Sequence, residues 1–89
     1  MSENPAPRSH AVDAAGRHRA VQDVAQWFDY EHLRGPARNV SQRVASLADT
    51  MLGLISADGP ELTTGLRKLL EAKDCLVRAA IAATGDQPS

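Results

Sequence analysis

Lys73 lies inside the apolar stripe of the most amphipathic segment of the chain, residues 60–81. At about 100° per residue on a helical wheel, Lys73 falls about 20° from Leu62, near the centre of the stripe. The apolar members of the stripe are Leu62, Leu66, Leu69, Leu76, Val77 and Ala80. A charged amine in this position must extend to solvent, pair with an acidic group or bind an anionic ligand.

Charged residues line one flank of the same stripe. Arg67, Asp74 and Arg78 fall at about 120–160° on the wheel. By default we interpret them as solvent-exposed residues of the helix surface. Asp74 is also spaced to orient Arg78, four residues further along the helix.

A second amphipathic helix is predicted from about Arg38 to Ile55. Gly35-Pro36 ends whatever precedes it, so the helix begins at Pro36-Ala37 or at Asn39. Its expected apolar face is Val40, Val44, Leu47, Met51, Leu54 and Ile55, with Ala48 and Leu52 at the side.

The two helices are joined by residues 56–59, and Asp58 is a candidate cap for a helix that starts at Pro60. So short a link predicts an antiparallel αα-hairpin over about residues 37–83. A shorter helix is predicted before it, from Ala11 or only from Arg19 to Trp27, followed by an irregular link at 29–33. Residues 1–9 and 85–89 are predicted to be disordered tails around one all-α domain at 10–84.

Composition excludes several classes of function. A net charge of -1 argues against binding to DNA or RNA polymers. No apolar run is long enough for a membrane span and no signal segment opens the chain, so we expect a soluble, cytoplasmic protein. Cys75 is the only cysteine, which excludes an intramolecular disulfide. No catalytic or metal-ligand spacing is present, so we expect neither an enzyme nor a cofactor.

The predicted hairpin is too small to be stable alone, because a core of this size rarely supplies more than about 3–5 kcal/mol. Self-association is the expected solution. The positions suited to contacts between subunits are Leu52, Leu70, Ile81 and the alanines at 79, 80, 82 and 83.

Two strings of residues resemble a known family. They are Phe28-Asp29-Tyr30-Glu31-His32-Leu33 before the hairpin and Leu69-Leu70-Glu71-Ala72-Lys73-Asp74-Cys75-Leu76-Val77-Arg78-Ala79-Ala80 within its second helix. Together with the link at 58–63 they resemble the phage anti-defence sponges, a family of helical hairpins that includes the anti-CBASS and Thoeris sponges. The resemblance covers about residues 27–82.

The resemblance implies a homo-oligomer, commonly a hexamer, that captures a nucleotide second messenger of bacterial immunity without cleaving it. The leading ligand is a cyclic di- or trinucleotide such as 3',3'-cyclic GMP-AMP. The alternatives are a cyclic ADP-ribose isomer and, from another class of function, a helical hairpin that binds a protein partner.

The candidate ligand-binding residues are Tyr30, His32, Lys73, Asp74, Arg78, Phe28 and Arg43. Tyr30 either stacks on a nucleobase or closes the open end of the hairpin, and Phe28 either contacts the ligand or packs in the core. Lys73 either meets a phosphate or forms a buried pair with an acidic group such as Asp74 or Glu71 of another subunit. The remaining candidates are interpreted either as contacts to a base or phosphate or as ordinary surface residues.

Overall fold

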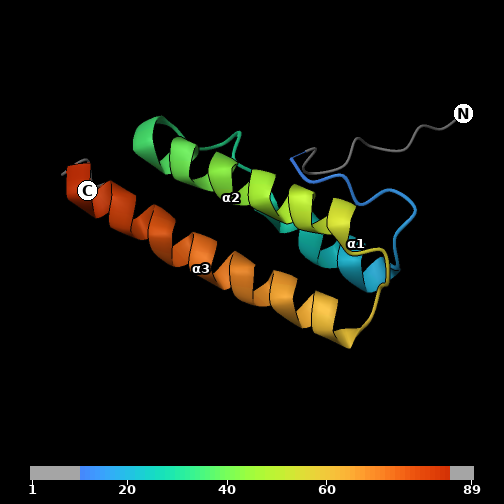
Figure 1. Cartoon of the computed structure of the whole chain (residues 1–89). Helices are drawn as coiled ribbons and strands as arrows, with labels where there is room; N and C mark the ends of the chain where they lie inside the picture. The colour runs from blue at the N-terminus through green and yellow to red at the C-terminus, as the bar shows by residue number, and fades with distance from the viewer. Residues whose placement is uncertain (1–10, 85–89) are drawn as a thin grey trace, which may run out of the picture.

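The described part of the chain is all-helical, which confirms the predicted fold class. The computed structural model describes residues 11–84, and the predicted tails lie outside them. The elements in this part are α1 (Arg19–Ala25), the 3₁₀ helix η1 (Gln26–Phe28), α2 (Gly35–Leu54) and α3 (Pro60–Thr84). α2 and α3 lie side by side and run in opposite directions, with α1 behind them in the view of Figure 1.

α1 begins at Arg19, the later of the two predicted start points. The Nδ1 atom of His18 accepts a hydrogen bond from the Ala20 amide at 3.0 Å and so caps the first turn. Gly16, with φ of 77°, turns the preceding chain toward this cap. α1 then contributes Val21 and Val24 to a core that α2 and α3 complete.

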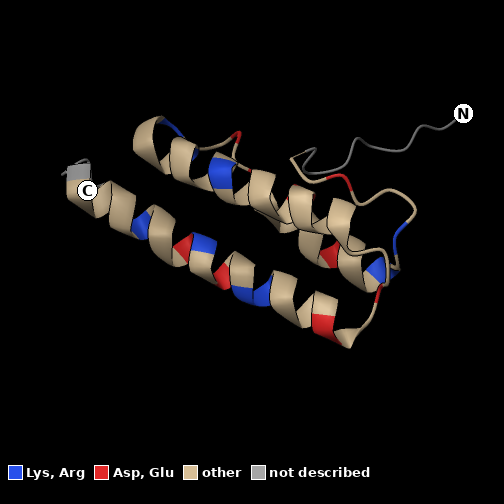
Figure 2. Ribbon diagram, in the orientation of Figure 1, with Lys and Arg blue, Asp and Glu red and all other residues tan. Residues whose placement is uncertain are grey.

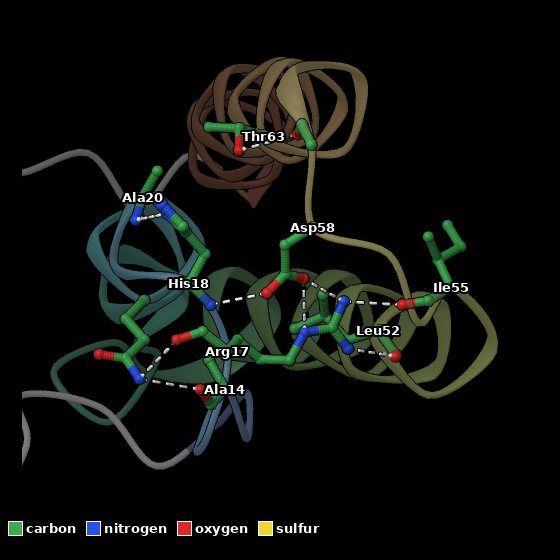
Figure 3. Close-up of polar contacts among 10 residues, drawn as sticks. Ala14, Arg17, His18, Ala20, Leu52, Ile55, Asp58 and Thr63 are labelled. Atoms are coloured by element: carbon green, nitrogen blue, oxygen red, sulfur yellow. Dashed lines mark hydrogen bonds and ion pairs between the residues drawn. The ribbon is translucent and has the colours of Figure 1, made fainter.

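Arg17 joins the segment before α1 to the C-terminal end of α2 (Figure 3). Its guanidinium donates to the Leu52 carbonyl at 2.8 Å and to the Ile55 carbonyl at 2.7 Å. Its Nε donates to Oδ1 of Asp58 at 2.7 Å. The last carbonyls of a helix lack partners within the helix, and a cation there also opposes the negative end of the helix dipole. One side chain therefore ends α2 and fixes the link to α3.

Asp58, a predicted cap of α3, accepts hydrogen bonds from Arg17 and His18, in the segment before α1. The His18 amide donates to its Oδ2 at 2.6 Å, beside the ion pair with Arg17. The hydrogen bond from His18 and then that from Arg17 lower the pKa of Asp58 below its ordinary 3.8. The folded state therefore favours the carboxylate form.

The free energy of unfolding should consequently depend on pH through Asp58. A lowered pKa in the folded state contributes stability that is present above about 3.8 and is lost as the pH falls through the folded value. We expect urea midpoints between about pH 5 and about pH 2.5 to fall less steeply in Asp58→Asn than in the unaltered chain. Glu61→Gln, which removes an exposed carboxylate nearby, is the control. An unchanged slope in Asp58→Asn would contradict this role.

The predicted core-facing side of α2 is wrong. The buried residues of this helix are Ala37, Ser41, Ala45, Ala48 and Leu52. Leu47 and Leu54 of the predicted face are 47% and 72% exposed. The difference arises because small residues let the backbone of α2 approach its neighbours closely, and dense packing outweighs the larger area of a leucine side chain.

The N-terminal segment covers one side of α2, which explains the direction of this rotation. Val12 and Ala14 are buried, and the Asp13 amide donates to Oδ1 of Asp49 at 2.9 Å. Leu52, predicted to contact another subunit, instead belongs to the core of its own chain at 4% exposure.

Candidate functional site

A pocket opens between α3 and the η1 segment with the link that follows it. Its volume is about 490 Å³, within the range of about 300–1,000 Å³ typical of small-molecule sites. The residues that line it are Trp27, Asp29, His32, Leu70, Lys73 and Asp74. Three of the predicted ligand-binding residues, His32, Lys73 and Asp74, therefore meet in one place.

The aromatic wall of the pocket depends on the tight winding of η1. A 3₁₀ helix has three residues per turn, so neighbouring side chains point about 120° apart. Phe28 is fully buried in the core, whereas Trp27 next to it is 49% exposed. The buried phenyl ring thus anchors the segment from which Trp27 reaches the pocket.

The link at residues 29–33 is a hydrogen-bonded turn that holds the polar wall. Oδ1 of Asp29 accepts from the Glu31 amide at 3.1 Å, and the Leu33 amide donates to the Tyr30 carbonyl at 3.0 Å. The other carboxylate oxygen of Asp29 lies 3.8 Å from Nδ1 of His32, an ion pair whenever the imidazole is protonated. Asp29 therefore orients both the turn and the imidazole.

The α3 wall carries the buried amine. Leu70, Lys73 and Asp74 are three and four residues apart, so they fall on neighbouring positions of the helix surface. The side chain of Lys73 is 9% exposed, and its Nζ lies 3.0 Å from Oδ1 of Asp74, whose side chain is 51% exposed. The amine thus leaves the apolar stripe at the pocket, with a carboxylate of its own chain as partner.

Asp74 is paired with Lys73, whereas Arg78 donates to Sγ of Cys75 at 3.4 Å, so the predicted orientation of Arg78 by Asp74 is wrong.

The charges of the α2–α3 pair concentrate on α3 (Figure 2), and the pocket contains both signs. Lys73 supplies one cation, and Asp29 and Asp74 supply two carboxylates. A uniformly anionic ligand would have to compete with these carboxylates for the amine. A ligand that carries both an anionic group and hydrogen-bond donors matches this arrangement better.

The other predicted site residues lie apart from this pocket. Tyr30 packs against the core, with the guanidinium of Arg38 5.2 Å from the centre of its ring, within cation–π range. Arg43 lines a separate polar hollow on α2 with Asn39, Gln42 and Ser46. Phe28, fully buried, presents no surface to a ligand.

Sequence reasoning missed Trp27, Asp29 and Leu70 as lining residues. Two adjacent aromatic residues cannot both face the core of a short helical segment. That signal identifies an exposed aromatic but not which of the pair it is. How close η1 and the link after it lie to α3 depends on the packing of α1. This tertiary contact cannot be predicted from periodicity in the sequence.

Within residues 11–84 no group of three or more His, Cys, Asp or Glu side chains could hold a metal ion. No helix of this part is long and apolar enough to cross a membrane. Comparison of the chain with protein-family models, curated proteins and solved structures gives no match. The functional interpretation therefore rests on the residues and geometry of the pocket, and on the resemblance of the two strings.

Proposed function

We propose that the chain is a sponge that binds and sequesters a cyclic oligonucleotide second messenger, such as 3',3'-cyclic GMP-AMP, and does not cleave it. The observation that carries the proposal is the Lys73 amine, which leaves an apolar helix face at a pocket walled by a half-exposed tryptophan. Replacing such a lysine by a leucine would cost the isolated chain little, so a ligand is the best reason for its presence.

In this proposal the base lies against Trp27, with Leu70 on the opposite wall. Stacking of a base on an aromatic side chain contributes about 1–3 kcal/mol. Lys73 exchanges part of its contact with Asp74 for a phosphate oxygen, and the freed carboxylate and Asp29 accept hydrogen bonds from the base.

Self-association is part of the proposal. The pocket of one chain is open, whereas Tyr30, Arg43 and Arg78 lie elsewhere on that chain. These residues contact a ligand bound at Lys73 only if a neighbouring subunit supplies them. A homo-oligomer, for which the resemblance implies a hexamer, would close the site in this way.

The test uses Trp27, the only tryptophan of the chain. Titration with cyclic di- and trinucleotides and cyclic ADP-ribose isomers should change its fluorescence for the true ligand. Ligand at a hundred times its dissociation constant should add about 2.7 kcal/mol to the unfolding free energy, which raises the melting temperature by roughly 10–20 °C. The linear form of each nucleotide is the control.

Heating the complex should return the cyclic nucleotide intact, measured by mass spectrometry. A linear product that accumulates with time would identify an enzyme instead. If every compound of the panel leaves both fluorescence and melting temperature unchanged, the proposed function is wrong.

A further inference from the structure

Both long helices carry a row of apolar and small residues that the fold of one chain covers only in part. On α2 the row is Val40, Val44, Leu47, Met51 and Leu54, here called the bulky row. On α3 it is Gly65, Leu69, Ala72, Leu76, Ala79 and Ala83, here called the small row. Each row alternates steps of four and three residues, the spacing of a helix that packs along a second helix.

Most residues of these rows are exposed or partly exposed, although Val44 and Leu69 also pack against the core. Leu47 and Leu54 of the bulky row are 47% and 72% exposed, and Leu76 of the small row is 51% exposed. Ile55, next to the end of the bulky row, is 40% exposed. Contiguous apolar surface of this kind on a soluble chain marks an interaction site.

The two rows lie on the same face of the α2–α3 pair. On the helical wheel of each helix, the centre of the row lies about 100° from the centre of the buried face, on the side where the wheel angle decreases. The opposite flank of each helix meets the N-terminal part of the chain, as Asp49 does with Asp13 and as Leu70 does at the Trp27 pocket. Seen along a common axis, the wheel angles of two antiparallel helices increase in opposite senses. The same offset of about 100° on both helices therefore places both rows on one face of the pair, opposite α1.

We propose that this apolar face binds a second copy of the chain, in a two-fold dimer that places the bulky row of each copy against the small row of the other. A two-fold axis parallel to the helices brings α2 of one copy onto α3 of its partner, in antiparallel orientation. The four long helices then form a bundle in which every neighbour is antiparallel. The surface is self-complementary, because the large side chains of the bulky row meet a row in which four of the six residues are glycine or alanine.

Gly65 supports a close neighbour on this face. Glycine is the poorest helix former after proline, and this one lies inside α3. An added Cβ would meet nothing within 4 Å in the single chain, so packing within the chain does not require glycine. Close approach of a bulky side chain from another copy would require it.

The size of the face also suits a second copy. Two helices about 30 Å long and 8–10 Å apart present a face about 20 Å wide, on the order of 600 Å² per copy. Stable interfaces bury about 600–1,000 Å² on each partner. The dimer therefore reaches the lower end of that range without further contacts.

This inference names one interface of the proposed self-association, on the flank opposite the Lys73 pocket, so it adds to the contacts that close the pocket and does not replace them, and its test needs no nucleotide. Sedimentation equilibrium of the full chain at about 100 μM should give at least twice the 9.5 kDa chain mass. Leu47→Glu and Leu76→Glu should each weaken the dimer at least tenfold, because each buries a charge without a partner. Gln42→Glu and Ala82→Glu, exposed positions on the same helices outside the rows, should leave the mass unchanged.

Gly65→Leu tests the same face without adding a charge. It should keep the helical circular dichroism of the single chain, where the space is open, and still weaken association. This variant decides the matter if a glutamate variant fails to fold. A monomeric unaltered chain, or an assembly that survives both Leu76→Glu and Gly65→Leu, would overturn the inference. Binding of nucleotide by the same preparations is scored separately, so failure of either proposal is recognised on its own.

Discussion

Arg17→Ala should lower the melting temperature by roughly 10–20 °C. This is a large loss of stability for a partly exposed residue. The side chain is 17% exposed and holds two carbonyls at the end of α2 together with the Asp58 carboxylate. Truncation removes this donor from the two carbonyls, whereas Asp58 keeps the hydrogen bond from the His18 amide. Hydrogen bonds from a charged group to such carbonyls contribute about 1.5–3 kcal/mol each before solvent compensates part of the loss. A net cost of about 3 kcal/mol follows, measured by thermal and urea unfolding.

Two variants show whether this cost comes from the described geometry. Arg17→Lys retains the charge but cannot donate in three directions from a planar group, so it should recover less than half of the loss. Arg19→Ala removes an exposed arginine two residues away and should change the melting temperature by less than about 2 °C. Equal effects of the Arg17→Ala and Arg19→Ala substitutions would show that Arg17 does not end α2 as described.

Lys73→Leu should weaken nucleotide binding about tenfold to a hundredfold while leaving the free chain as stable as before or more so. The loss of affinity corresponds to one charge-assisted contact, about 1.5–3 kcal/mol. The free chain tolerates the change because the partner of the amine, Asp74, is half-exposed and regains water when the amine is removed. Leucine in turn continues the apolar stripe.

Lys68→Leu is the matched control for this prediction. It removes the same charge from the same helix at an exposed position that does not line the pocket, so affinity should stay within about threefold. Titration calorimetry gives the affinities and thermal unfolding the stabilities. If Lys73→Leu instead unfolds the chain, the amine has a structural role, since breaking a buried pair costs about 3–5 kcal/mol. If affinity is unchanged, the nucleotide binds elsewhere.

Helical periodicity was sufficient to predict the class of the fold and the limits of its long helices. α2 begins three residues before the predicted Arg38, because Pro36 occupies its first turn. The position of Lys73 in the stripe of α3 was also predictable, and the residue is 7% exposed. Both features depend on local spacing alone.

Features that depend on contacts between elements were not predictable in the same way. The buried side of α2 was misplaced because a hydrophobic average favours leucine, whereas the docked N-terminal segment selects Ala45 and Ala48. The polar contacts of Arg17 join residues about forty positions apart, and nothing in the local sequence indicates them. Tyr30, for which stacking on a nucleobase was one of two expectations, packs against the core, whereas Trp27 lines the pocket.

The adjacent pair Trp27 and Phe28 separates anchoring from recognition. Phe28 contributes to the core and is fully buried, whereas Trp27 contributes to the pocket and is half-exposed. A substitution at the pocket residue changes the surface offered to a ligand without opening a cavity in the core. Under the proposed function, variation at Trp27 alters which molecule the pocket binds, while selection for a stable fold acts on Phe28. The scaffold is in this sense open to changes of ligand preference by single substitutions.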